Sequence, residues 1–519
     1  MNPPAAPAPP QSDVIIVGAG MAGLYTAWRL LRRRPDRTIR LIERLPRTGG
    51  RLESDRVVIN GQPVKTEEGG MRFMDSHIEL MGLLKELGLT GQVVPFPMGS
   101  DANLFYLRGQ RFTLGQARVD PGIWGRIFNL NPGAIGVPPG EVLTGLLKAI
   151  LTENGVDPTQ WQPTPDAWTT LRMRYTYRGI PTYRWGFWAM LTDYGLSADC
   201  IEMLYQSSGF VAPYDQEINA GCALQLLVDF VDPAFHTLQG GYETLPNTLA
   251  EAVVAAGAAI TLSEQVVAME RQSGGGIRVV TRGTDGQPGT YLGKEVVLAV
   301  TQFALQQLIP QVAMFRETPR FMEDVDSVTD MQLGKINLYY DRNWWTPATG
   351  ISSGGSYTDL PLAQFYCFAH QPDPGPAGPA SITLYTDYYR TQYWAQLQAI
   401  GGPYQVANGP EAPPYSEPAS TFVVEQATRQ MREMLGLGDI PAPVLATYRR
   451  WGASPAGDGD HQWRVGVDDV AVRARLANPF PNVYVCGESY SDDQAWVNGA
   501  LRSADQVLAA HFGRGADLA

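Results

Sequence analysis

A glycine-rich segment near the start of the chain has the spacing of a phosphate-binding turn. The sequence Gly18-Ala19-Gly20-Met21-Ala22-Gly23 directly follows the apolar run 13–17 and opens the helical pattern 21–33. In such a strand–turn–helix unit the first glycine permits the tight turn, the second lets the backbone approach a pyrophosphate, and the third lets the helix pack on the strand. The helix N-terminus offers free N–H groups and a positive dipole end to phosphates.

An acidic residue completes this pattern. Glu43 ends the predicted strand 38–43 and lies 20 residues after Gly23. At that spacing a carboxylate accepts hydrogen bonds from both ribose hydroxyls of an adenosine. The segment therefore predicts a dinucleotide site.

Three later segments resemble those of the flavin amine oxidase family and distinguish FAD from NAD. The sequence of 47–51, Arg-Thr-Gly-Gly-Arg, resembles the family's second glycine pair and arginine. Residues 68–73 resemble its segment along the flavin, and residues 483–488 resemble its third FAD segment. The resemblance extends from Asp13 to about Ala509 and is weakest over 131–230. It implies bound FAD.

The resemblance also implies which residues contact the cofactor. We expect FAD to be held without a covalent bond, because Cys486 lies inside the predicted strand 482–486, away from where some monoamine oxidases attach their flavin. The expected contacts are Gly18, Gly20, Met21, Ala22, Gly23, Glu43, Arg44, Gly50, Arg51, Gly70, Met71, Arg72, Val267, Gly487, Glu488, Trp496 and Val497.

Within the family, three details resemble L-amino acid oxidases more than polyamine or monoamine oxidases. They are Gly70-Met71-Arg72 with His77 following, the stretch 354–361, and Leu384-Tyr385-Thr386. The resemblance implies that Arg72 clamps the substrate carboxylate and that Tyr385 adds a neutral donor. A guanidinium forms a bidentate fork with a carboxylate, and an amine without a carboxylate would need neither residue.

Two further positions are assigned by the same resemblance. The apolar stretch 333–338 is similar to a strand whose lysine, here Lys335, holds a water near flavin N5. A buried lysine is costly unless it has a partner or a function. Trp496 resembles the aromatic member of the family's Gly-Trp pair, but Ala495 replaces the glycine whose carbonyl receives the substrate amine. The extra methyl group would narrow the pocket. The following helix would direct its positive end at the flavin.

Together these residues predict the oxidative deamination of an L-amino acid. Arg72 and Tyr385 would hold the carboxylate while a hydride passes from Cα to flavin N5. The imino acid would hydrolyse to a 2-oxo acid and ammonia, and dioxygen would reoxidise the flavin to give hydrogen peroxide, with Lys335 and its water assisting. Residues 385–387 followed by Tyr393-Trp394 resemble bacterial tryptophan oxidases, which favours a broad, apolar or aromatic preference.

Several alternatives stay open. Asp387, which we place among the substrate contacts, or Asp232 or Glu243 could instead select a basic side chain such as that of lysine or arginine. An L-amino acid 2-monooxygenase would use the same residues and give an amide. A polyamine or monoamine oxidase and a non-catalytic flavin-binding module are the remaining possibilities.

The composition excludes other partners. The 519 residues carry a net charge of −12, which disfavours nucleic acid and anionic lipid. Four distant cysteines and five histidines show no metal-ligand spacing, so we expect reduced thiols and no metal. The first twelve residues read as a Pro-rich tail without a signal peptide, and no apolar run is long enough for a membrane helix. We expect a cytoplasmic protein that uses an amino acid and O2 and, by resemblance, forms a homodimer or larger oligomer.

The elements that must position these residues come from both ends of the chain. This predicts a mixed α/β fold with a discontinuous, Rossmann-like FAD-binding domain, an inserted mixed-sheet substrate domain and a helical domain. After the tail 1–12, we assign 13–56, 237–320 and 446–512 to FAD binding. Residues 57–130 and 321–445 form the substrate domain, in which 321–445 reads as alternating strands, and 131–236 form the helical domain.

Overall fold

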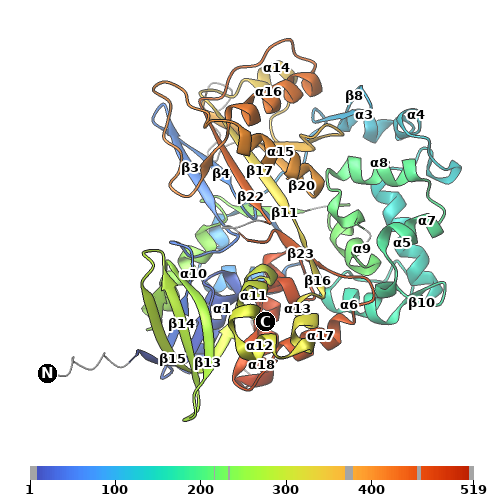
Figure 1. Ribbon diagram of the computed structural model, residues 1–519. Coiled ribbons are helices and arrows are strands. Elements are labelled where there is room, and N and C mark those ends of the chain that lie inside the picture. Colours follow the sequence, from blue (N-terminus) through green and yellow to red (C-terminus); the bar gives the residue numbers. More distant parts are fainter. Residues whose placement is uncertain (1–8, 216, 232–233, 369–377, 453–456, 514–519) are drawn as a thin grey trace.

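The structure is a computed structural model that describes residues 9–215, 217–231, 234–368, 378–452 and 457–513. It confirms a mixed α/β fold with two large sheets (Figure 1). Most of the expected Pro-rich tail lies outside the described residues, and its last two positions, Gln11 and Ser12, already belong to β1 (Gln11–Val17). In the part of the chain described here, no helix combines the length and apolar character needed to cross a bilayer.

The first sheet has seven strands and carries the glycine-rich turn. Its order is β12 (Ala259–Thr261), β2 (Ile39–Ile42), β1, β15 (Pro288–Leu298), β14 (Ile277–Gly283) and β13 (Glu264–Arg271), and β24 (Val483–Val485) also pairs with β15. The pairs around β1, β2, β12 and β24 are parallel, whereas β13, β14 and β15 form an antiparallel ribbon. Strands from residues 11 and 485 therefore share one sheet.

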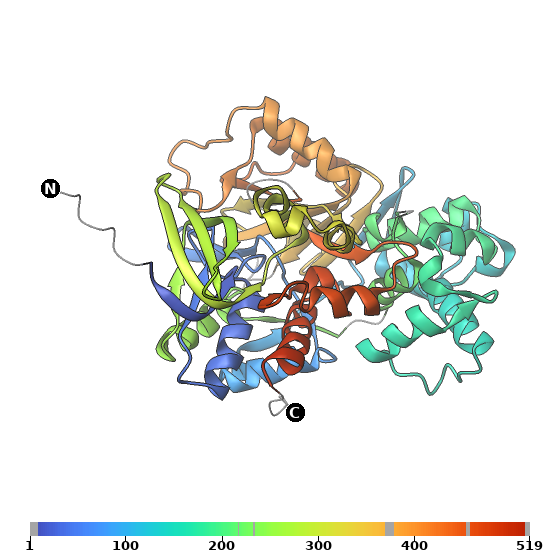
Figure 2. The ribbon, with the colours of Figure 1, turned by 60° about the horizontal axis from the view of Figure 1, so that its bottom comes forward.

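Both faces of this sheet are covered, which explains why β1 is continuously apolar. Val14 and Ile16 pack in the cluster formed by α1 (Met21–Arg33), α10 (Thr244–Ala255) and α18 (Val497–His511). Ile15 and Val17 belong to the cluster on the other face, with α11 (Gln302–Leu308) and α13 (Pro319–Val325). Figures 1 and 2 show α1 and α18 lying side by side, so the two ends of the sequence meet.

The second sheet has eight strands. Its order is β21 (Glu417–Pro418), β22 (Leu445–Trp451), β17 (Leu333–Tyr340), β20 (Ala380–Asp387), β19 (Gln364–Phe368), β18 (Gly354–Thr358), β7 (Leu104–Leu107) and β8 (Gln110–Thr113). Ile336, Leu338 and Leu384 face the apolar cluster under the covering helices. Because side chains alternate along a strand, Lys335 and Tyr385, which are cross-strand partners, face the other way.

Helices interrupt the region that was expected to be alternating strands. The covering helices α14 (Trp345–Thr349), α15 (Tyr389–Ile400) and α16 (Thr421–Leu435) all fall inside 321–445. For α16 the signals were readable: the hydroxyl of Ser420 caps its first turn, and Gly436 ends it with φ +69°. The strands predicted at 335–340 and 382–385 are confirmed as parts of β17 and β20, whereas the three helices were missed.

Short helices form a separate layer beside the second sheet (Figures 1 and 2). They are α3 (Leu114–Val119), α4 (Ile123–Ile127), α5 (Pro139–Glu153), α6 (Pro165–Arg174), α7 (Phe187–Asp193), α8 (Ala198–Ser208) and α9 (Ala220–Val228). The other elements that bear on the site are β3 (Ser54–Ile59), β4 (Gln62–Glu67), β5 (Phe73–Met74), α2 (Ile78–Glu86), β6 (Val93–Pro95), β11 (Phe235–Leu238), β16 (Val328–Met331), β23 (Asp460–Trp463) and α17 (Asp469–Leu476). The domain bounds given above stay a prediction.

Candidate active site

A cavity of about 520 Å³ runs from the glycine-rich turn to the second sheet. Its walls come from the carboxyl ends of β1 and β2, from β17 and β20, and from the start of α18. Ligands of open α/β sheets bind at such strand ends. The predicted residues that line it are Gly18, Gly20, Met21, Ala22, Glu43, Arg44, Gly50, Arg51, Gly70, Val267, Lys335, Tyr385, Gly487, Glu488, Ala495, Trp496 and Val497. Gly23, Met71, Arg72 and Asp387 do not line it.

The three glycines of the turn differ in what a side chain would meet. A Cβ on Gly18 would lie 2.4 Å from the carbonyl oxygen of Ala299, and one on Gly23 would lie 2.0 Å from that of Gly18. A Cβ on Gly20 would meet only a Cα, at 3.8 Å, and would point into open space. Packing therefore requires two of the glycines, whereas Gly20 leaves room for a ligand. The first turn of α1 also has no side-chain cap and no acidic residue. Both features fit a pyrophosphate.

Glu43 lines the cavity directly after β2, and its carboxylate is held by two backbone N–H groups. Its Oε2 accepts from the backbone N–H of Ala19 at 2.8 Å and its Oε1 from that of Leu45 at 2.9 Å. Each carboxylate oxygen has a second lone pair, so Glu43 is fixed in place and can still accept from a hydroxyl.

A charged cluster supports the C-terminal FAD segment. Arg51 donates to Glu488 at 2.7 Å, and His461 lies 2.9 Å from the same carboxylate. Burial opposes ionisation of Glu488, but these two cations dominate and lower its pKa to about 2. The contacts with Glu488 and Asp458 raise the pKa of His461 to about 10 against the effect of burial. Asp330, Asp458 and His461 also lie close enough to hold a metal ion, but His461 and Asp458 are paired with each other and Asp330 accepts from the backbone N–H of Gly459.

Lys335 is held by backbone carbonyls at the floor of the cavity. Its Nζ donates to the carbonyl of Glu67 at 2.8 Å and to that of Gly69, and its third polar contact is a weak one, with Met71 Sδ at 3.6 Å. Burial lowers its pKa to about 8, against the charges of Glu67 and Glu68. Its Nζ lies 5.2 Å from the ring centroid of Tyr385. A buried ammonium that can lose its proton near neutral pH is thus fixed at the cavity wall.

Arg72 lies behind this wall in a box of aromatic rings. Its guanidinium carbon is 4.9 Å from the ring of Phe230 and 5.1 Å from that of Phe235, and the rings of Phe96 and Tyr366 lie 5.6 Å away. The residue is 7 % exposed. Among the described residues, no carboxylate oxygen lies within 4.0 Å of it, and its polar contacts are long ones, to Met98 Sδ at 3.5 Å and Tyr366 Oη at 3.4 Å.

Trp496 separates the Arg72 box from the cavity. Its ring stacks with that of Phe230 at 6.0 Å, and Asp229 accepts from its Nε1 at 2.9 Å. The ring of the buried His77 packs against that of Trp496, with 5.0 Å between the ring centroids. His77 is neutral, because burial lowers its pKa to about 3. Ala495 precedes Trp496 with φ +70°, a left-handed conformation that costs a non-glycine residue about 1 kcal/mol. The alanine at position 495 therefore places a methyl group at the cavity wall in a strained backbone conformation.

Asp387 does not fit the predicted contact with substrate. It is fully buried, and its Oδ2 accepts from the backbone N–H groups of Val211 and Ala212 at 2.6 and 2.7 Å. Its place is the junction between β20 and the helical layer. Glu243 is bonded to Arg56 and to the backbone of Ser54, and Asp232 lies outside the described residues.

Among the residues that line or adjoin the site and were missed from the sequence, Asp460 and Phe230 bear most on the chemistry. Asp460 lines the cavity at the start of β23, and Phe230 covers Arg72. Both belong to segments without a regular pattern, and β23 is only four residues long. The one available signal for Asp460 was its place in a glycine-rich stretch shortly before the final FAD segment.

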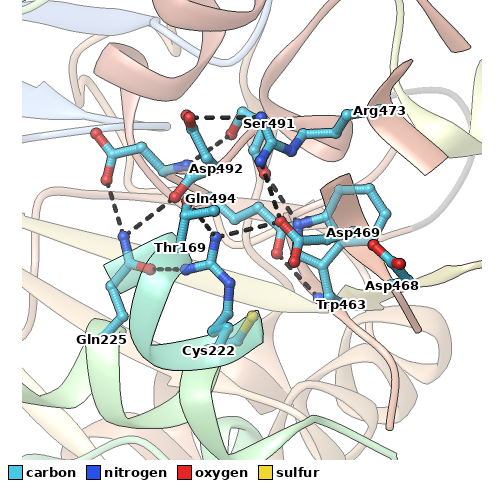
Figure 3. Close-up of polar contacts among 12 residues, drawn as sticks. Thr169, Cys222, Gln225, Trp463, Asp468, Asp469, Arg473, Ser491, Asp492 and Gln494 are labelled. Carbon is cyan, nitrogen blue, oxygen red and sulfur yellow. Dashed lines mark hydrogen bonds and ion pairs between the residues drawn. The ribbon is translucent and has the colours of Figure 1, made fainter. Parts of the chain in front are cut away.

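A buried polar network fastens the helical layer to the C-terminal segment (Figure 3). Arg172 of α6 bonds to Gln225 of α9 and lies 3.3 Å from Asp469, and both partners of this ion pair are 1 % exposed. Gln225 donates to the backbone carbonyl of Asp492, and Trp463 donates to that of Ser491. These contacts tie α6 and α9 to the C-terminal segment that leads to Trp496.

The sheet, the glycine turn and the cavity define a dinucleotide-binding flavoprotein fold. The sequence profile of the flavin containing amine oxidoreductases matches residues 21–507, and the chain belongs to this family. FAD is its cofactor. The chain is 24% identical to achacin of Lissachatina fulica, over 96% of this chain and 93% of that protein.

Two further proteins show how far the likeness extends. The chain is 23% identical to the flavin-dependent L-tryptophan oxidase RebO of Lentzea aerocolonigenes, over 95% of this chain and 96% of that one. The solved structure of wild-type putrescine oxidase bound to putrescine has the same fold, with a TM-score of 0.66 and 17% identity over 97% of this chain and 99% of that chain.

Proposed function

We propose that the chain is an FAD-dependent L-amino acid oxidase, which deaminates an L-amino acid oxidatively to a 2-oxo acid, ammonia and hydrogen peroxide. The observation that carries this proposal is the state of Arg72. A buried guanidinium is costly without a counter-charge, and no acid of the described residues supplies one. A substrate carboxylate would supply the missing charge through a bidentate pair.

The neighbours of Arg72 suit this role. Burial raises the pKa of Tyr385, so its hydroxyl stays protonated and can donate to a carboxylate. The Arg72 charge acts on the pKa values of both Tyr385 and Lys335, which places all three groups in one electrostatic unit. Because the ring of Phe230 covers the guanidinium, a carboxylate can reach Arg72 only if this side chain moves.

The reaction divides between cofactor and protein. FAD, when bound, supplies the oxidation of the Cα–N bond and the transfer of electrons to O2. The protein orients the substrate through Arg72 and Tyr385, and Lys335 holds a water in place of its weak contact with Met71 Sδ. With a pKa of about 8, Lys335 can also exchange a proton during turnover near neutral pH.

Aromatic rings at the cavity wall and directly behind it favour an apolar or aromatic side chain. The ring of Phe210 lies 5.4 Å from that of Tyr385, and Phe230 links it to Trp496. RebO, by its name, oxidises L-tryptophan, which agrees with this preference. An L-amino acid 2-monooxygenase would share the same site and differ in giving an amide.

A substrate survey tests the proposal. The purified yellow protein is assayed for hydrogen peroxide and 2-oxo acid with the L-amino acids, their D-isomers, and the amines that lack the carboxyl group, including putrescine. We expect activity with apolar or aromatic L-amino acids alone. Arg72→Lys keeps the charge but loses the fork, and Arg72→Met loses both, so kcat/KM should fall in that order. Faster turnover of decarboxylated amines would contradict the proposal, and an amide product would identify the monooxygenase.

A further inference from the structure

The cavity contains a carboxyl group that the proposed function does not use. Asp460 opens β23 and lines the cavity, and its Oδ1 is buried without a hydrogen-bond partner among the described residues. Within the same residues, no Lys, Arg or His nitrogen lies within 4.0 Å of its carboxylate. A buried acceptor of this kind normally has a partner, which a water or a ligand in the cavity can supply.

The positively charged groups near Asp460 form ion pairs with other carboxylates. The titratable groups that interact with Asp460 are Arg51, Asp330, Tyr385, His461 and Glu488. The guanidinium of Arg51 and the ring of His461 are both paired with Glu488, and His461 is also paired with Asp458. Burial raises the pKa of Asp460 to about 8, with Glu488 adding to the effect and His461 opposing it. Its surroundings therefore lack a free positive charge.

We propose that the carboxyl group of Asp460 binds a positively charged nitrogen of the substrate. The inference rests on the proposed function, in which Arg72 takes the carboxylate, and it adds the complementary contact at the opposite charge. Tyr385 lies within the electrostatic reach of both Asp460 and Arg72. The three acids that the sequence offered for a cation do not serve, since Asp387 and Glu243 do not line the cavity and Asp232 lies outside the described residues.

Binding of the cation has a consequence that can be measured. The carboxyl group of Asp460 is mostly neutral at pH 7 in the free protein, and a bound ammonium favours its ionised form. Its proton then passes to the solvent. With a pKa of about 8, binding should release about 0.9 proton per ligand at pH 7 and about 0.1 at pH 9.

Matched ligand pairs test the contact and locate the nitrogen. The anaerobic holoenzyme is titrated with 6-aminohexanoate against hexanoate, which differ in a distal ammonium, and with 2-aminoisobutyrate against isobutyrate, which differ in the α-ammonium. Neither amino compound can be oxidised as an α-amino acid. The α-carbon of 2-aminoisobutyrate carries no hydrogen, and the amino group of 6-aminohexanoate is not on its α-carbon. Perturbation of the flavin absorbance gives Kd, and calorimetry in two buffers gives the protons released.

The variants are Asp460→Asn, which keeps the shape of the side chain, and Asp330→Asn. Asp330 belongs to the same acidic cluster, does not line the cavity, and accepts from the backbone N–H of Gly459 at 2.8 Å, a contact that Asn retains. A hydrogen bond to a charged group corresponds to roughly a 10- to 100-fold change in affinity. We expect Asp460→Asn to lose that advantage and the proton release for one ammonium ligand. Asp330→Asn should retain the affinity advantage and release fewer protons at pH 7, because the charge of Asp330 raises the pKa of Asp460.

The outcomes separate the two proposals. Loss confined to 6-aminohexanoate assigns Asp460 to a basic side chain, and loss confined to 2-aminoisobutyrate assigns it to the α-amino group. Equal affinities of Asp460→Asn and wild type for both ammonium ligands overturn the inference, even if L-amino acids are oxidised. Two results together would keep the cation contact and refute the L-amino acid proposal. Asp460→Asn would weaken the binding of 1,4-diaminobutane, and Arg72→Met would leave the affinity for hexanoate unchanged.

Discussion

Replacing Lys335 with Met should change how the stability of the protein depends on pH. Lys335 is 2 % exposed, and burial lowers its pKa from 10.5 to about 8. Between these pH values the unfolded chain binds a proton that the folded chain does not, so the stability of the wild type rises with pH. From pH 7 to pH 10 the gain is about 2.5 kcal/mol. Lys335→Met cannot titrate and lacks this gain.

Thermal melts at the two pH values measure the effect. For a chain of 519 residues, 2.5 kcal/mol corresponds to a shift in Tm of about 2 °C. We expect the Tm of the wild type minus that of Lys335→Met to increase by this amount between pH 7 and pH 10, although the two unsatisfied carbonyls lower the variant's Tm at both. Lys85→Met is the control, because its exposed ammonium is hydrated in both states. A difference that is independent of pH would refute the assignment of a depressed pKa to Lys335.

Three other perturbations follow from the site. Ala495→Gly removes the backbone strain of a φ of +70° and should leave Tm unchanged or raise it by up to about 1 °C. The variant's kcat/KM should rise for substrates with larger side chains. A lower Tm would show that the alanine is unstrained. Arg172→Met breaks a buried ion pair and should lower stability by about 3–5 kcal/mol, and the double variant with Asp469→Leu should recover most of the loss in Tm. FAD should leave the protein on acid precipitation, because Cys486 is buried away from the cavity, and a yellow pellet after washing would disprove this.

The nucleotide half of the site was predictable because its constraints are local. Gly18 and Gly23 are required by close backbone contacts, and such contacts recur wherever a strand turns into a helix over a pyrophosphate. The same holds for Glu43, whose distance along the chain fixes its place at the end of β2. The family resemblance then supplied Lys335 and Tyr385, which the register of β17 and β20 brings together.

The substrate half was less predictable because it depends on contacts between distant segments. The box around Arg72 combines Phe96, Phe230 and Tyr366 from three parts of the chain, and no spacing rule relates them. Asp387 was misplaced because its sequence neighbour Tyr385 lines the cavity. Alternation along β20 does not separate residues two apart, but Asp387 lies at the strand end, where the backbone N–H groups of Val211 and Ala212 in the helical layer donate to it.

We propose above all that the buried guanidinium of Arg72 binds the carboxylate of the substrate. The most direct test is a flavin absorbance titration of wild type, Arg72→Lys and Arg72→Met with 3-phenylpropanoate and its neutral amide. The account predicts that the wild type binds the acid more tightly than the amide and that Arg72→Met loses this preference, by roughly 10- to 100-fold. Equal binding of acid and amide by the wild type, or an undiminished preference for the acid in Arg72→Met, would contradict it.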